Sequence, residues 1–248
     1  AQHSSDGKFY QEVSLPAGLY ALEADMIATR QSGGKADSKG VFLFANNTDS
    51  EEDFSVEAST GNNAPEHFSV SFVTKGGVFQ IGVRAVSTTC NWIAMDNFKL
   101  YYYGETDMSL EQINLGKVIA GLEKRYNNHV EAGDHMGRTA LVDAYDALYE
   151  VVLAAYENGG LEDPAEYTQL GDSLTKAYNA VSASIQDYKQ FAKNMEAVQD
   201  RIAEQEEMNA SCAAELADYY DVLADEYEKA EWTREQIDEI PGVVSDIL

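Results

Sequence analysis

Apolar and polar positions alternate with a period of two along the first 104 residues. The alternation is clearest in Phe68, Val70 and Phe72, and it recurs from Val78 to Val83. Such a period places every second side chain on one face of a strand, so these segments predict strands with one buried face. Clusters of Gly, Asn, Asp and Ser separate them, which is typical of an all-β sandwich. We predict seven strands, at residues 8–14, 19–28, 40–45, 54–57, 67–74, 78–85 and 92–103.

After Gly104 the apolar residues recur at helical spacing. This change of period predicts two domains, a β-sandwich at residues 1–104 and a helical part at residues 105–248. Ser109 and Gln112 fit a capping box, so a first helix is expected from there to about residue 130. A second helix is expected to stop at the paired glycines 159–160.

A third helix is predicted to open at Pro164, where a proline in the first turn costs no hydrogen bond. Its apolar positions at residues 174–195 alternate in steps of four and three, as in a coiled-coil seam, and we expect this seam to dock on the first two helices. A fourth helix repeats these steps at residues 216–230, and Pro241 is expected to end a short fifth. Together the helices predict an elongated antiparallel bundle.

Composition and charge narrow the classes of partner. Charged residues make up 24% of the chain and aromatic residues 10%, a composition that can bury a core. The formal net charge of -26 repels phosphate and therefore argues against nucleic acid as a partner. Residues 105–248 carry most of it, with 31 acids against 10 bases, whereas residues 1–104 have 12 against 7. No apolar stretch approaches about 18 residues, so neither a membrane span nor a signal peptide is expected within the chain.

Motifs for catalysis are missing from the sequence. It has no nucleophile elbow, phosphate loop, dinucleotide fingerprint or zinc-hydrolase motif. Cys90 and Cys212 lie 122 positions apart and form no metal-binding pair motif. His129, Asp134 and His135 share a predicted loop, but their spacing fits no zinc pattern, so we expect solvated turn residues. Acidic pairs suited to glycoside hydrolysis occur in nearly any chain this acidic. We do not expect an enzyme.

Two motifs carry a resemblance to a known superfamily. Residues 10–20, YQEVSLPAGLY, contain Gln-x-Val-x-Leu-Pro-x-Gly-x-Tyr, and residues 91–100, NWIAMDNFKL, contain Asp-Asn-Phe-x-Leu. Through these two motifs, residues 8–103 resemble the galactose-binding-like jelly roll of carbohydrate-binding modules. The resemblance implies a jelly-roll sandwich and a glycan as partner. More faintly, residues 180–189, an alanine-rich run ending in Ser-Ile-x-x-Tyr, resemble the helical repeats called "found in various architectures".

Modules of this superfamily begin with an additional strand before the point where this chain starts. The resemblance therefore implies that the first strand is lacking and that the chain belongs to a longer polypeptide. A second interpretation is that Ala1 and Gln2 form a new terminus left by signal peptidase. Either interpretation favours an extracellular or cell-surface location.

Candidate site residues cluster near the end of the β-domain. Trp92 offers a flat aromatic face that could stack on a sugar ring, and Arg84 and Asn91 lie near it in sequence as hydrogen-bonding groups. The alternative for Trp92 is a packing residue of the core or rim. Asp96 matches the superfamily position that often holds a structural calcium, and Asp6 or a carbonyl near Lys8 could supply a further ligand. The alternative for Asp96 is a buried aspartate bonded to a turn.

These observations favour a non-catalytic glycan-binding module on a helical spacer. We expect it in an exported or surface polysaccharide-handling protein of a Gram-negative bacterium. The alternative is a structural or assembly protein, in which the sandwich packs on neighbouring domains and the bundle mediates association.

Overall fold

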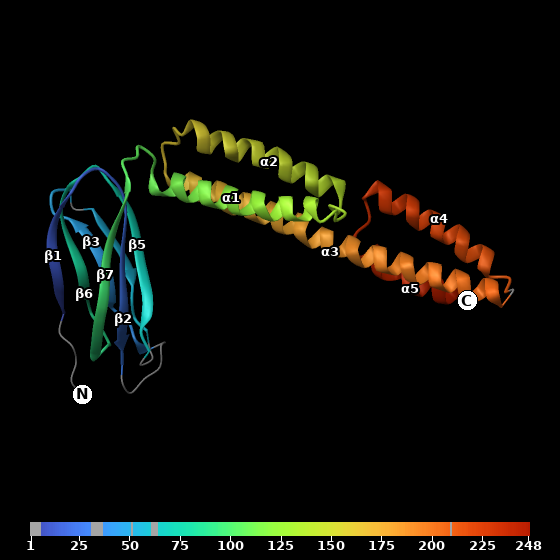
Figure 1. The fold of residues 1–248 in the computed structure, drawn as a ribbon, viewed down its shortest axis with the longest axis horizontal. Helices are drawn as coiled ribbons and strands as arrows, with labels where there is room; N and C mark the ends of the chain where they lie inside the picture. Colours follow the sequence, from blue (N-terminus) through green and yellow to red (C-terminus); the bar gives the residue numbers. More distant parts are fainter. Residues whose placement is uncertain (1–5, 31–36, 51, 61–63, 209) are drawn as a thin grey trace. The chain divides into compact units, whose positions relative to one another are not determined.

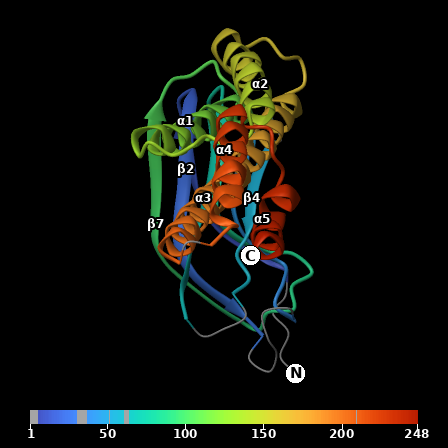
Figure 2. The same ribbon diagram turned by 90° about the vertical axis from the view of Figure 1, so that its right-hand side faces the viewer.

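The computed structural model describes residues 6–30, 37–50, 52–60, 64–208 and 210–248, so Ala1 and Gln2 lie outside the described residues. The chain divides into two compact units, residues 1–110 and 111–248. Strands make up the first unit and helices the second, so the predicted order of β followed by α is confirmed (Figures 1 and 2).

Two antiparallel sheets form the first unit. Their strands are β1 (Gly7–Leu15), β2 (Gly18–Thr29), β3 (Val41–Asn47), β4 (Asp53–Glu57), β5 (Glu66–Thr74), β6 (Gly77–Ala85) and β7 (Trp92–Gly104). They match the seven predicted strands to within a few residues at each end. One sheet has the order β1-β6-β3-β4 and the other has the order β5-β2-β7.

A single apolar core lies between the two sheets. Leu43 of β3 and Phe79 of β6 come from the four-stranded sheet, while Leu22 of β2 and Phe72 of β5 come from the three-stranded one. All four side chains are buried. Because side chains alternate along a strand, the residues directly before and after each of these four point to the outer face of their sheet. The fold therefore presents two outer faces on which a site can be built.

Five helices form the second unit. They are α1 (Leu110–Glu131), α2 (Thr139–Asn158), α3 (Ala165–Glu207), α4 (Ala213–Lys229) and α5 (Arg234–Ile247). Within the described residues, no helix is both long enough and apolar enough to cross a membrane.

The long helix α3 serves two separate cores. Its amino-terminal part packs with α1 and α2, and its carboxyl-terminal part packs with α4 and α5 (Figure 1). Ile185 is the last α3 residue of the first core and Tyr188 is the first of the second. The seam predicted at residues 174–195 therefore docks on α1 and α2 along only part of its length. The prediction is wrong for the carboxyl-terminal part of the seam, which packs with α4 and α5 instead. A continuous apolar stripe does not show where the partner helices change.

Pro241 lies inside α5 and does not end it. A proline within a helix leaves the carbonyl four residues earlier without its usual N–H donor, and that carbonyl belongs to Ile237. In the structure, the side-chain amide of Asn194 on α3 donates to the Ile237 oxygen at 3.0 Å. The expectation that Pro241 stops the helix is wrong because a distant residue satisfies the orphaned acceptor.

Replacing Asn194 by alanine is expected to destabilise the helical unit by about 1–3 kcal/mol, because the buried Ile237 carbonyl loses its donor. In a Pro241→Ala background the restored N–H can donate to that carbonyl, so Asn194→Ala should cost clearly less. Urea unfolding followed by far-ultraviolet circular dichroism measures all four proteins. Equal costs in both backgrounds would contradict the assignment.

The loop between α1 and α2 is packed rather than solvated, contrary to expectation. The carboxylate of Asp134 bonds to His129 at 2.7 Å and pairs with Lys189 at 2.9 Å. The ring of His135 lies 4.4 Å from that of Tyr188 and 4.5 Å from that of Tyr227. Spacing along the sequence did not reveal this, because the loop lies where the two helical cores meet and its partners are far away in the chain.

His135 is held in its neutral form. Its Nδ1 accepts from the Gly137 N–H at 3.0 Å, and its Nε2 donates to the Tyr227 carbonyl at 3.1 Å. Burial lowers the pKa of His135 below its usual value. The unfolded chain therefore binds the proton more readily, and stability rises with pH in the window just below the unfolded value of about 6.5.

As the pH falls from about 7 to about 5, we expect the helical unit of the wild type to lose more stability than that of a His135→Gln variant. The variant has no group that titrates at this position, so comparing the two slopes removes the contribution of the many carboxylates. Thermal melting of the helical signal at several pH values gives the slopes. Parallel slopes would show that His135 does not contribute.

Candidate functional site

Polar side chains gather on the outer face of the three-stranded sheet. On β2 the even-numbered residues from Tyr20 to Ala28 lie in the core, so Glu23 and Asp25 point outward. In register with Asp25 lie His67 on β5 and Asp96 on β7. Antiparallel pairing thus brings residues from three distant segments onto one face.

These side chains form a connected network. One carboxylate oxygen of Asp25 bonds to His67 Nδ1 at 2.9 Å, and the other accepts from the Asn97 amide at 2.9 Å. Glu23 lies 3.6 Å from the other ring nitrogen of His67. The hydrogen bond from Asn97, followed by that from His67, lowers the pKa of Asp25. The Asp25 side chain therefore stays ionised at neutral pH and can accept hydrogen bonds there.

A β-bulge aims Asn97 at this network. Glu23 pairs with Lys99 and Asp25 pairs with Asp96, so β7 has one residue more than β2 between these two pairs. Asn97 takes up the extra length in a left-handed conformation, with φ of 57°. Asparagine tolerates that conformation better than most residues, which explains its presence here.

Exposed aromatic rings flank the network on the same face. Ile93 packs on the core, so alternation turns Trp92 outward, and its side chain is 39% exposed. Beyond the network Tyr101 and Tyr103 also point outward, with ring centroids 6.3 Å apart. We call this set the outer strip; it comprises Trp92, Glu23, Asp25, His67, Asn97, Tyr101 and Tyr103.

The outer strip is long. Trp92 pairs with Thr29 and Tyr101 pairs with Ala21. These β2 positions are eight residues apart, which corresponds to about 26 Å at about 3.3 Å per residue. A strip of this length suits an extended ligand that contacts rings at both ends and polar groups in the middle.

The structure separates the residues that the sequence grouped around Trp92. Asn91 is exposed directly before Trp92, and its backbone N–H donates to the Thr29 carbonyl at 3.1 Å. Arg84 lies on β6, on the outer face of the other sheet, where its guanidinium pairs with Asp53 at 2.7 Å. The structure therefore does not place Arg84 on the face that carries Trp92.

Other contacts of Arg84 explain its position. Its guanidinium carbon lies 5.6 Å and 5.3 Å from the ring centroids of Phe42 and Phe44, and its Nη2 also donates to Ser55 Oγ at 3.0 Å. These contacts join β6 to β3 and β4. Arg84 thus packs the outer face of the four-stranded sheet.

The two candidate calcium ligands also lie apart. Asp6 accepts from the backbone N–H of Ser87 at 2.7 Å, beside the end of the four-stranded sheet. Asp96 accepts from the backbone N–H of Asn97 at 2.7 Å, in the three-stranded sheet. Among the described residues, no group of three His, Cys, Asp or Glu side chains could hold a metal ion. Because calcium needs about 6–8 converging oxygens, Asp6 and Asp96 do not fit a shared calcium site.

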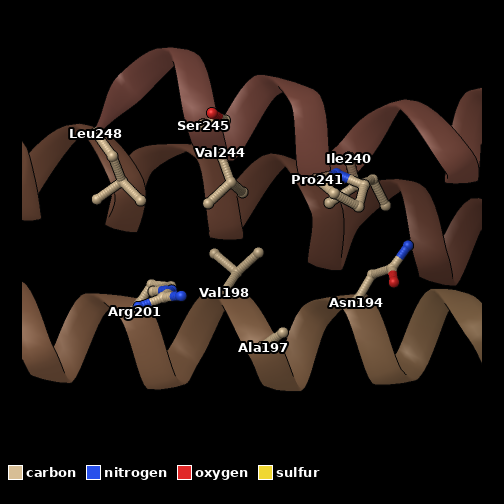
Figure 3. Close-up of a pocket in the computed structure, with 9 residues that line it drawn as sticks. All are labelled: Asn194, Ala197, Val198, Arg201, Ile240, Pro241, Val244, Ser245 and Leu248. Carbon is tan, nitrogen blue, oxygen red and sulfur yellow. The ribbon is translucent and has the colours of Figure 1, made fainter.

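The helical unit contains an apolar hollow of about 320 Å³ between α3 and α5 (Figure 3). Val198 and Ile240 line it and are buried. The two polar side chains that α3 places at this hollow are already engaged, Asn194 with the Ile237 carbonyl and Arg201 with Glu204 at 2.6 Å. This hollow offers contact area but few directed polar groups, so the outer strip is the stronger candidate site.

Comparison with known sequences adds no assignment: no family model matches the chain, and no curated protein is similar to it.

Trp92→Ala is expected to cost less than about 2 kcal/mol of stability, because the side chain is 39% exposed. Phe72→Ala is the control, since this ring is fully buried and its truncation should cost about 3–5 kcal/mol. Denaturant unfolding of the β-unit gives both values. If the Trp92 variant lost as much stability as the Phe72 variant, Trp92 would be a core residue.

Proposed function

We propose that the chain binds an extended glycan along the outer strip, without catalysing a reaction on it. The observation that carries this proposal is the arrangement of exposed rings at both ends of a network of hydrogen-bonding side chains. Aromatic faces stack on the C–H faces of sugars, and a few directed polar groups fix the orientation of the hydroxyls. The resemblance of residues 8–103 to carbohydrate-binding modules supports the same function.

The electrostatics of the network favour binding over catalysis. Glycoside hydrolysis requires a carboxylic acid with a raised pKa, placed across the scissile bond from a second carboxyl group. Here hydrogen bonds lower the pKa of Asp25, and Glu23 and Asp25 both lie beside the same His67 ring. They are suited to accept hydrogen bonds from sugar hydroxyls.

In this proposal the first unit is a jelly-roll binding module, and the acidic helical unit is a spacer within an exported, surface-associated protein of a Gram-negative bacterium. Neighbouring domains of a longer polypeptide would be its other partners. The structural or assembly alternative is supported by a different feature, the exposed edge of β1.

A glycan array followed by titration in solution is expected to identify a bound polysaccharide. Trp92→Ala and Tyr103→Ala should each weaken binding at least about tenfold, since stacking of an aromatic ring on a ligand contributes on the order of 1 kcal/mol or more. Phe98→Ala is the matched control. Phe98 lies on β7 like Trp92 and Tyr103 and is also 39% exposed, but its side chain lines a hollow beside β1 instead of the outer strip.

Two results would contradict the proposal. One is an array without any bound glycan. The other is a bound glycan whose affinity falls with Phe98→Ala but not with Trp92→Ala.

A further inference from the structure

The edge strand β1 lacks several of the features that normally prevent sheet edges from pairing, although it carries the charged residues Lys8 and Glu12. It pairs with β6 at every position from Gly7 to Leu15 without a register shift. On its other side, no strand of the described residues pairs with it. Proteins usually protect such edges with bulges, prolines, short strands or inward-pointing charges. β1 has none of these, and Phe9 and Tyr10 are 69% and 42% exposed.

Two of the other edge strands of this unit, β4 and β7, are better protected. β4 is five residues long and has an acid at each end, Asp53 and Glu57. The bulge at Asn97 interrupts the regular ladder of β7. β1 is therefore better suited than β4 or β7 to pairing with another strand.

The apolar core is open beside β1. A hollow of about 400 Å³ lies there, lined by β1, β6, β2 and β7. Its apolar residues are Phe9, Val13, Ile81, Leu22, Phe98 and Leu100. An added strand with alternating apolar residues would both extend the four-stranded sheet and cover this opening.

The backbone of β1 directs alternate peptide groups to the free edge. The carbonyl oxygen of Phe9 lies against Gly82 of β6, 2.1 Å from where a Cβ would stand there. The Phe9 peptide group therefore points toward β6. In an antiparallel strand, successive residues point their N–H and C=O groups to opposite sides. Lys8, Tyr10 and Glu12 accordingly direct theirs outward, where a partner strand can bond to them.

The charges of β1 are complementary to those of a second β1. Lys8 and Glu12 share the outer face, where the amide of Gln80 lies between them, bonding to Lys8 and donating to Glu12 at 3.0 Å. In a two-fold antiparallel pair centred on Tyr10, Lys8 stands opposite the partner's Glu12, and Glu12 opposite the partner's Lys8. Opposite charges at facing positions stabilise a strand pair, and like charges destabilise it.

We propose that two copies of this chain pair through β1, in the antiparallel register centred on Tyr10, to join their four-stranded sheets. The partner's Phe9 and Val13 then lie on the inner side of the joined sheet, beside the opening of the hollow. One strand pair buries less than a standard interface of about 1,200–2,000 Å², so the dimer is weak and in exchange with monomer. The net charge of -26 on each copy opposes pairing, and added salt strengthens it.

Sedimentation of the full chain over a range of concentrations tests this proposal, at about 0.15 M salt and above. The wild type should dimerise at high concentration. Lys8→Glu and Glu12→Lys, measured separately, should each associate at least about tenfold more weakly, because each places like charges opposite one another twice. An equimolar mixture of the two variants should dimerise again, since every facing pair is then of opposite charge.

Circular dichroism melting of each variant confirms that it is folded; both changes lie on exposed side chains. A wild type that stays monomeric throughout would overturn the proposal. A dimer that both single variants leave unchanged would place the interface elsewhere. Variants that fail to recover as a mixture would overturn the Tyr10-centred register.

Discussion

The alternation of side chains along β2 is the constraint on which the β-unit depends. β2 lies at the centre of its sheet and pairs with both β5 and β7, so its register fixes two other strands. Its even-numbered residues fill the core, and a shift by one residue would bury Glu23 and Asp25. The cost of burying those carboxylates holds the register, and the same register brings His67 beside Asp25. Core and outer strip are thus two results of a single alternation.

In the helical unit, packing depends on one continuous helix that changes partners. α3 can serve two cores because its apolar stripe continues past Ile185, where α1 and α2 give way to α4 and α5. The change of partners creates polar requirements that only distant residues meet. Asn194 satisfies the Ile237 carbonyl, and the loop carrying His135 fills the region where the cores meet.

Local patterns predicted the elements well because periodicity is a local property. All seven strands and most helix ends follow from apolar spacing, glycines and caps. The order of strands within the sheets does not, and that order separates Arg84 from Trp92 although they are near in sequence. His67 and Asp25 were missed for the same reason, since their contact depends on the pairing of β2 with β5. The sequence did contain one signal for this site. Glu23 and Asp25 are acids at alternate positions of β2, on the face opposite to the one that its apolar even-numbered residues form.

One irregularity has two effects on the β-unit. The bulge at Asn97 turns an amide toward Asp25, and it also breaks the regular ladder that another chain would need to pair with β7. The proposed binding surface and the proposed pairing edge are therefore separated: one occupies the outer face of the three-stranded sheet, and the other the β1 edge of the four-stranded sheet. Because they share no residue, pairing through β1 would leave both outer strips available. Two linked strips raise the effective concentration of the second site for a long polysaccharide, so even a weak dimer would strengthen binding to such a ligand more than to a short one.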